Sequence, residues 1–151
     1  MQDIPWQDLP QQDQELVEQA QQALALAYCP YSRFQVGAAL RCTDGTIITG
    51  VNVENASYGM TICAERGAIM HARARGYTQF EALAVITRNE GELTSTPASP
   101  CGACRQVLFE AAQAAGTQLK VILTAADKSC CILTDTEELL PLGFGPKDLA
   151  C

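Results

Sequence analysis

The sequence predicts an α/β fold, a three-layer α/β/α sandwich with a mixed five-stranded sheet. Strand-like and helical segments alternate along the chain, a short turn separates the first two strands, and hydrophobic residues make up 48% of the composition. Strands that alternate with helices after an opening hairpin form one mixed sheet with helices on both faces. A chain of 151 residues buries about 70% of its unfolded surface, so we expect a single domain over 1–151, with an irregular lead at 1–12.

The first half of the chain contains one helix and two strands. Apolar residues recur at helical spacing over 13–27, and Asp13 is a candidate N-cap for this helix. Runs of Val, Ala, Leu and Ile predict strands over 34–41 and 47–53, on either side of a turn at Asp44-Gly45. We expect these two strands to form a hairpin.

The second half alternates helices with strands. The expected segments are a helix at 63–75, a strand at 80–87, a helix at 101–115 and strands at 119–123 and 130–133. Gly76 and Gly116 follow the two helices, where glycine most easily takes the left-handed conformation that ends a helix. Thr136 can cap a short final helix that Pro141 stops.

Composition and charge exclude several classes of function. The net charge is −7 and the basic residues are scattered, so we expect no nucleic-acid partner. The acidic first 32 residues contain no Lys or Arg, which argues against a secretory or mitochondrial targeting segment. No apolar run approaches the roughly 18 residues of a membrane span, and the predicted core needs no disulfides. We therefore expect a soluble protein of the reducing cytoplasm, with no membrane partner.

Three cysteines and one glutamate have the spacing of a catalytic zinc site. Cys101 and Cys104 are three residues apart at the start of a helix, so their thiols lie on one face, and Cys63 begins another helix. The partial positive charge at helix N-termini favours the thiolates that a metal needs. Three protein ligands leave one position open, and Glu65 is close enough to act as a general acid and base.

Two arginines adjoin these ligands, and alternatives to a catalytic zinc site stay open. Arg66 and Arg105 can donate hydrogen bonds to the sulfurs and so restore some of the Lewis acidity that three thiolates remove. A structural site with four cysteines usually has two Cys-x-x-Cys motifs, whereas this chain has one. A redox pair at Cys101 and Cys104 would leave the remaining site residues unexplained.

The single histidine and the other cysteines do not fit the site. His71 lies eight residues beyond Cys63, about 12 Å further along the same helix, which is too far for both to bind one ion. The other cysteines lack ligand spacing and are expected to be small core or surface residues: Cys29, Cys42, Cys130, Cys131 and Cys151.

Several motifs together connect the chain with a known family. Cys63-Ala64-Glu65 and Pro100-Cys101-Gly102-Ala103-Cys104 match the signature of zinc deaminases. With them, the chain resembles the cytidine deaminases of the small, three-cysteine, homotetrameric kind. Further matches follow in order through most of the chain: Tyr31-Ser32-Arg33-Phe34, Gly37-Ala38-Ala39-Leu40, Asn52-Val53-Glu54-Asn55-Ala56, 99–107, Leu139-Leu140-Pro141 and Phe144-Gly145-Pro146.

The resemblance implies a reaction and its catalytic residues. It implies a zinc-dependent hydrolase of pyrimidine salvage, which converts cytidine and deoxycytidine into uridine and deoxyuridine and releases ammonia. By similarity, Cys63, Cys101 and Cys104 bind Zn²⁺, and Glu65 carries protons from water to the pyrimidine ring and to the departing amine.

The resemblance also implies how the nucleoside is bound. Asn52 and Glu54, which share a face of the predicted strand because they are two residues apart, match binders of the ribose hydroxyls. Phe34 matches an aromatic wall, and the backbone of Ala64 matches a contact with the base. The substrate-binding positions that reach across subunits of the implied homotetramer are Tyr58 and Phe144.

Three other functions are weighed against this one. A deaminase for a modified cytosine nucleoside such as blasticidin S shares the zinc motif, but Asn52 and Glu54 favour a pocket that binds ribose. A polynucleotide deaminase needs a basic, aromatic-lined channel, of which this acidic chain gives no sign. A zinc-stabilised binding module without catalysis would have no need of Glu65.

Overall fold

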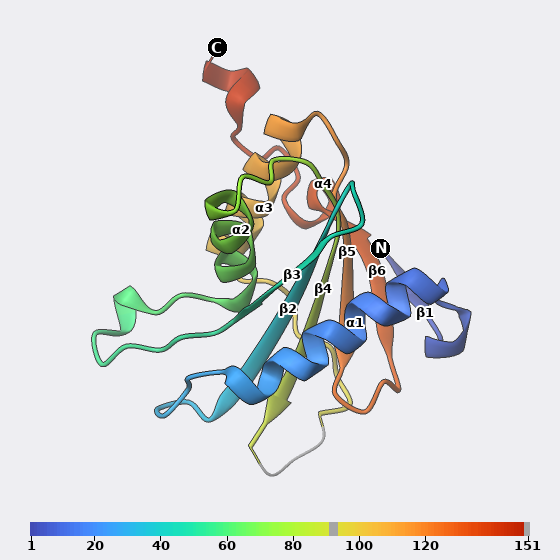
Figure 1. Cartoon of the computed structure of the whole chain (residues 1–151), viewed down its shortest axis with the longest axis vertical. Coiled ribbons are helices and arrows are strands. Elements are labelled where there is room, and N and C mark those ends of the chain that lie inside the picture. Colours follow the sequence, from blue (N-terminus) through green and yellow to red (C-terminus); the bar gives the residue numbers. More distant parts are fainter. Residues whose placement is uncertain (91–93, 150–151) are drawn as a thin grey trace.

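A six-stranded mixed sheet with helices on both faces forms the centre of the molecule (Figure 1). The computed structural model describes residues 1–90 and 94–149. Its helices and strands are, in chain order, β1 (Gln2–Ile4), α1 (Gln11–Ala23), β2 (Phe34–Cys42), β3 (Ile47–Val51), α2 (Ala64–Ala74), β4 (Phe80–Asn89), α3 (Gly102–Ala115), β5 (Lys120–Ala125), β6 (Cys131–Asp135) and α4 (Thr136–Leu139). Short 3₁₀ helices lie at Trp6–Asp8, Leu24–Leu26, Tyr58–Met60 and Pro146–Leu149.

The strands lie in the order β1-β6-β5-β4-β2-β3. β4 and β5 are parallel because α3 carries the chain back across the sheet between them, whereas the other neighbours are antiparallel. The hairpin expected from the sequence is formed by β2 and β3, with Ala38 opposite Gly50. The predicted α/β/α sandwich with a mixed sheet is confirmed.

The sheet has six strands rather than the expected five. The additional strand is β1, which lies in the N-terminal segment expected to be irregular and pairs antiparallel with β6 at the sheet edge. β1 has three residues, which is too few to show the alternation that identifies the other strands. β1 pairs with residues near the other end of the chain, so no sequence pattern within β1 itself predicts this strand.

The C-terminal ends of two helices follow the sequence, whereas the start of the last helix does not. Gly76 and Gly116 have φ angles of 86° and 66°, in the left-handed region expected of residues that end helices. Thr136 is not the cap of the last helix. Asp135 is the N-cap of α4, and its carboxylate accepts a hydrogen bond from the N–H of Glu138 at 2.8 Å.

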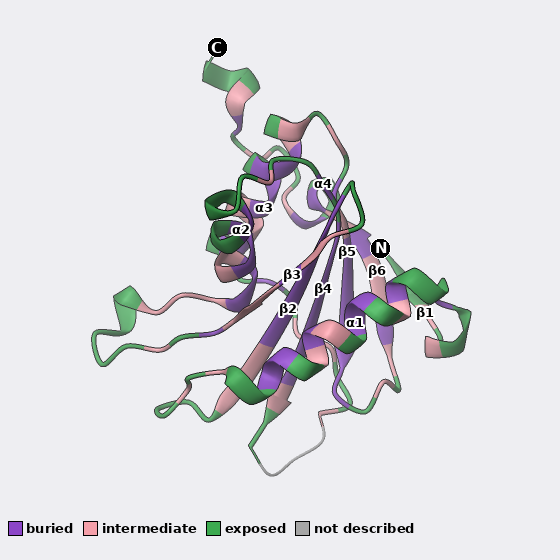
Figure 2. Cartoon of the chain, viewed as in Figure 1, coloured by how far each residue is buried: buried purple, intermediate pink, exposed green. Residues whose placement is uncertain are grey.

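Each face of the sheet has its own core. α1 covers one face, and α2 and α3 cover the other (Figure 1). The buried side chains, coloured purple in Figure 2, follow the strands and the helix faces that pack on them. Gly37 allows α1 to lie directly on β2, because a Cβ atom here would be 2.1 Å from the carbonyl oxygen of Ala20.

A buried ionic cluster joins α1 to the sheet. The expectation that Asp13 caps α1 is wrong, because Pro10 is the N-cap and Asp13 lies in the first turn, completely buried. One Asp13 carboxylate oxygen accepts a hydrogen bond from Arg41 on β2 at 2.8 Å, and the other accepts one from Lys120 on β5 at 2.7 Å. Arg41 also pairs with the more exposed Glu81 on β4. Ion pairing with the sheet therefore takes precedence over capping.

We expect Asp13→Ala to lower the free energy of unfolding by about 3–5 kcal/mol, because it leaves the buried Arg41 without its buried partner. Urea titration followed by circular dichroism measures this change. Glu81→Ala is the control, since it removes the exposed partner of the same arginine and should cost about 1 kcal/mol or less. Equal losses in the two variants would contradict the dominance of the buried pair.

Candidate functional site

Three sulfur atoms meet at the N-terminal ends of α2 and α3. Cys63 is the N-cap residue of α2, Cys101 is the N-cap residue of α3, and Cys104 lies in the first turn of α3. The Cys63 and Cys101 sulfurs are 3.8 Å apart, and the Cys101 and Cys104 sulfurs are 3.6 Å apart. Tetrahedral zinc with Zn–S bonds of about 2.3 Å holds its sulfur ligands about 3.8 Å apart. The cluster is therefore able to hold a metal ion, and its donor set suits Zn²⁺.

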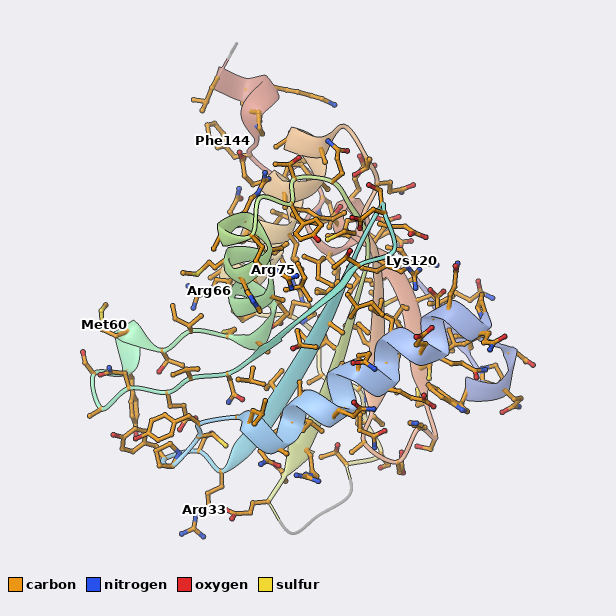
Figure 3. The ribbon with its side chains drawn as sticks, in the orientation of Figure 1. Arg33, Met60, Arg66, Arg75, Lys120 and Phe144 are labelled. Atoms are coloured by element: carbon orange, nitrogen blue, oxygen red, sulfur yellow. The ribbon has the colours of Figure 1, made fainter. Side chains whose placement is uncertain are left out.

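The surroundings of the cluster favour a thiolate at Cys63. A hydrogen bond from the Cys104 thiol lowers the pKa of Cys63 to about 5, with further contributions from Arg66 and Cys101. The same hydrogen bond, together with burial, raises the pKa of Cys104, because the shared proton stays on that sulfur. Arg66, on α2 (Figure 3), places Nη2 4.0 Å from the Cys63 sulfur. This contact is the one expected of a residue that donates to a thiolate.

Arg105 has a different role from the one expected. It donates hydrogen bonds to the carbonyl oxygen of Pro100 at 2.8 Å, to the hydroxyl of Ser99 at 2.9 Å and to the carbonyl oxygen of Leu139 at 3.2 Å. The expectation that it donates to the sulfurs is wrong, because its guanidinium group binds these oxygens instead. Arg105 thus holds the loop that leads into Cys101 and ties it to the end of α4.

Glu65 lies beside the sulfur cluster in the first turn of α2 and is 4% exposed. Burial raises the pKa of Glu65, and the charge of the neighbouring Cys63 raises it further. A carboxyl group of this kind is suited to accepting and releasing a proton. Its position depends on Gly50 in β3, where a Cβ atom would be 2.4 Å from the carbonyl oxygen of Ala64. Glycine at this position lets the first turn of α2 lie directly on the sheet.

A cavity of about 270 Å³ opens beside the cluster. Its walls come from β2 and the loop before it, the chain after β3, the start of α2, β4 and the loop before α3. The lining residues are Ser32, Phe34, Val36, Asn52, Glu54, Thr61, Cys63, Glu65, Val85, Thr87, Ala98, Ser99 and Cys101. The structure thus brings most of the predicted site residues around one space.

Glu54 presents an ionised carboxylate to this cavity. Its Oε2 atom accepts hydrogen bonds from the N–H groups of Tyr31 at 3.0 Å and Ser32 at 3.2 Å, and the Ser32 hydroxyl donates to Oε1. The hydroxyl of Ser32, followed by the two N–H groups, lowers the pKa of Glu54. The carboxylate is therefore an acceptor for hydroxyl groups near neutral pH.

Asn52 uses its side chain to complete the sheet where β3 ends. Its Oδ1 atom accepts a hydrogen bond from the N–H of Val36 at 2.9 Å, and its Nδ2 donates to the carbonyl oxygen of Phe34 at 2.8 Å. The backbone N–H of Asn52 also donates to the carbonyl oxygen of Val36 at 3.2 Å, so Asn52 extends the pairing with β2 by one residue beyond β3. The N–H of Val53 then donates to Ile62 instead. Asn52 therefore fixes the two cavity residues of β2.

Three predicted substrate contacts lie outside the cavity lining. Ala64 is completely buried at the first position of α2. Tyr58 is 71% exposed and borders a neighbouring cavity with Glu54, where its ring centre is 5.7 Å from that of Tyr31. Phe144 is 58% exposed on the segment after α4, well apart from the Tyr58–Met60 turn (Figure 3). Neither aromatic side chain lines the cavity of its own chain.

The remaining candidates lie apart from the cluster, as the sequence suggested. His71 is exposed on α2, with Nδ1 3.2 Å from the carbonyl oxygen of Thr49. The free cysteines outside the cluster are Cys29, Cys42, Cys130 and Cys131, and Cys151 lies outside the described residues.

Sequence reasoning missed part of the cavity wall. Val85 and Thr87 alternate along β4, so the period of a strand could have placed them together once the buried face was known. Ala98 and Ser99 precede the second zinc motif in a segment without regular structure, and the pattern there gives no sign of their position.

Comparison with known proteins agrees with this geometry. The family model for the cytidine and deoxycytidylate deaminase zinc-binding region matches residues 10–117, which include all three clustered cysteines. The chain belongs to this family. Its cofactor is accordingly Zn²⁺, which the cysteine cluster fits.

Individual members of the deaminase family match most of the chain. A cytidine deaminase of Halalkalibacterium halodurans is 46% identical over 136 residues, which cover 90% of this chain and 96% of the relative. One of Sporosarcina psychrophila is 44% identical over 137 residues, covering 91% and 94%. A crystal structure of cytidine deaminase from Burkholderia pseudomallei superimposes with a TM-score of 0.76 at 45% identity and covers 86% of this chain and 97% of that one.

We expect the purified protein to contain about one zinc ion per chain and Cys101→Ser to lose it, because two thiolates and water hold zinc poorly. Plasma mass spectrometry measures the zinc content. Cys130→Ser is the matched control, because this partly buried cysteine lies outside the cluster and should retain zinc. Full zinc in Cys101→Ser would contradict the assignment of the ligands.

Proposed function

We propose that this protein is a zinc-dependent cytidine deaminase, a hydrolase that converts cytidine and deoxycytidine into uridine and deoxyuridine with release of ammonia. The observation that carries the proposal is one cavity lined by Cys63, Cys101 and Glu65 together with Asn52 and Glu54. The first three residues suit hydrolysis at a metal ion, and the other two suit the hydroxyl groups of a sugar.

Glu65 moves the protons of the proposed reaction. Zn²⁺, when bound by the three cysteines, supplies Lewis acidity that makes water reactive near neutral pH. Glu65 takes a proton from the attacking water as the C–O bond forms at the amine-bearing ring carbon, and gives it to the adjacent ring nitrogen. Glu65 then takes the proton of the hydroxyl group added to the ring carbon and gives it to the amine. The C–N bond breaks, ammonia leaves, and the hydroxyl oxygen becomes the carbonyl oxygen of the product. The raised pKa of this buried carboxyl group suits both transfers.

The cavity favours a nucleoside over a nucleotide or a nucleic acid. Among the described residues its lining contains the carboxylates of Glu54 and Glu65 and no Lys, Arg or His. Away from the metal, a phosphate group would therefore meet negative charge with no basic side chain of the lining to balance it. The net charge of −7 acts in the same direction.

Within one chain we assign four residues to the nucleoside. Phe34 forms a wall against the base, and the backbone of Ala64 contacts the base edge. Glu54 accepts a hydrogen bond from a ribose hydroxyl. Asn52 donates one Nδ2 hydrogen to Phe34, so its second Nδ2 hydrogen stays available for the sugar.

We further assign Tyr58 and Phe144 to sites completed across subunits of a homotetramer. Both side chains are large, aromatic and mostly exposed, and Met60 and Leu142 near them in the chain are exposed as well. Exposed apolar side chains of this size are typical of surfaces that another protein chain covers.

We propose pyrimidine salvage as the role of this reaction and the cytoplasm as its location. The described cysteines are all free thiols, as expected in a reducing compartment. No helix within 1–90 or 94–149 has both the length and the apolar character of a membrane span.

We expect the zinc-loaded protein to deaminate cytidine, followed as loss of the cytidine ultraviolet band. Glu65→Gln should lower the turnover rate by at least about 100-fold, because the amide cannot carry protons. Its zinc content should be unchanged, since Glu65 is not a ligand.

The same assay distinguishes the alternatives. A zinc-stabilised binding module would show no turnover in either form of the protein. Turnover of blasticidin S without turnover of cytidine would assign the protein to modified cytosine nucleosides instead.

The proposed tetramer has a mass of four times 16.2 kDa, about 65 kDa, which sedimentation equilibrium measures. If Phe144 completes a neighbour's site, Glu65→Gln and Phe144→Ala chains should each be inactive or weakly active alone. Co-expressed, they should recover part of the activity, because some mixed sites then contain both intact residues. A monomeric, fully active protein would contradict this arrangement.

A further inference from the structure

Thr87 contributes a hydroxyl group to an otherwise apolar wall of the cavity. The wall is formed by side chains that β2 and β4 direct to one face of the sheet, namely Phe34, Val36, Val85 and Thr87. Val36 lies directly opposite Thr87 in the pairing of these strands. Thr87 is the polar member of this group, and the proposed reaction gives it no role.

The Thr87 hydroxyl has no hydrogen-bond partner among residues 1–90 and 94–149. The residue is 2% exposed, and its Oγ1 atom is buried and unpaired. The backbone of the residue is satisfied, because its carbonyl oxygen accepts a hydrogen bond from the Thr94 hydroxyl at 2.8 Å. Buried hydroxyl groups are nearly always paired in folded proteins, so this one is available to a partner from outside the chain if such a partner can reach it.

The cavity is the space from which such a partner can come. Other hydroxyl groups of the lining already have partners, since Ser99 accepts a hydrogen bond from Arg105 and Thr61 accepts one from the N–H of Asn55. Thr87 itself borders the cavity. Rotation about its Cα–Cβ bond by about 120° moves the hydroxyl group to the position that the methyl group held and can direct it toward a bound molecule.

We propose that the Thr87 hydroxyl binds a hydrogen-bonding atom on the pyrimidine ring of the substrate. Phe34, Val36 and Val85 provide an apolar surface against which a planar ring can lie, and Thr87 adds a hydrogen bond at the edge of that ring. This inference rests on the proposed function, since it takes a cytosine nucleoside as the ligand. It makes Thr87 a residue that determines substrate specificity.

Thr124 provides a matched control on the next strand. Its hydroxyl is likewise buried without a hydrogen-bond partner in the described part of the chain, and the weakly bonding Cys131 thiol lies beside it. Thr124 lies outside the cavity lining, on the face of β5 that α1 covers, with Ile122. The two threonines thus differ in their access to the cavity, not in their burial.

Thr87→Val replaces the hydroxyl with a methyl group of similar shape. In zinc-loaded protein we expect kcat/KM for cytidine to fall roughly tenfold, the effect of one lost hydrogen bond. The melting temperature should rise by about 2–4 °C, because a buried unpaired hydroxyl has been removed. Thr124→Val should raise the melting temperature similarly with kcat/KM unchanged. Thr87→Ser keeps the hydroxyl and should recover most of the lost kcat/KM.

Each of the other possible results would contradict either the role proposed for the Thr87 hydroxyl or the proposed function. If the unsubstituted protein deaminates cytidine and Thr87→Val does so equally well, the hydroxyl does not bind substrate and the proposed function stands. If Thr87→Ser loses as much kcat/KM as Thr87→Val, the shape of the wall matters and the hydroxyl does not. Unequal losses for cytidine and deoxycytidine would overturn the assignment to the ring. Absence of turnover in the unsubstituted protein removes the proposed function and this inference with it.

Discussion

Three sulfur atoms from two helices have to meet at one point, and this requirement governs how the layers of the fold pack. Cys63 and Cys101 both occupy N-cap positions, so α2 and α3 have to begin close together on the same face of the sheet. Gly50 lets α2 approach β3 closely, and Arg105 ties the loop before α3 to the carbonyl oxygen of Leu139. Residues that never touch the metal therefore contribute to the geometry of its ligands.

Among the protein side chains of the site negative charge dominates, and this favours an uncharged substrate. The Cys63 thiolate and the carboxylates of Glu54 and Glu65 border one cavity. Arg66 offsets part of this charge at the Cys63 sulfur, whereas Arg105 is committed to backbone and hydroxyl oxygens. A neutral base carrying sugar hydroxyl groups adds no charge to such a site, and its hydroxyls find acceptors there. The electrostatics and the proposed substrate class are thus consistent.

The chemistry of the site was more predictable from the sequence than the shape of its cavity. The spacing of Cys101 and Cys104 at a helix start is a local property, so their meeting followed from helix geometry. The alternation of helices and strands predicted the layers in the same way. The role of Asp13 could not be predicted from local sequence, because its partner Arg41 lies on a distant strand. Only the tertiary packing shows that Asp13 forms an ion pair and does not cap the helix. The unpaired hydroxyl of Thr87 was likewise beyond local patterns, since it depends on which segments surround β4.

The side chain of Asn52 has a consequence for how the protein can vary. It holds the start of β2 with two side-chain hydrogen bonds in addition to the bond from its backbone N–H to Val36, so this pairing is made before the segment that follows Glu54. Insertions or deletions between Glu54 and Thr61 can therefore change the rim of the cavity while the register of the strands is kept. The length of this segment can thus change independently of the sheet. Related proteins can differ in the substrates that enter the cavity and still keep the same fold.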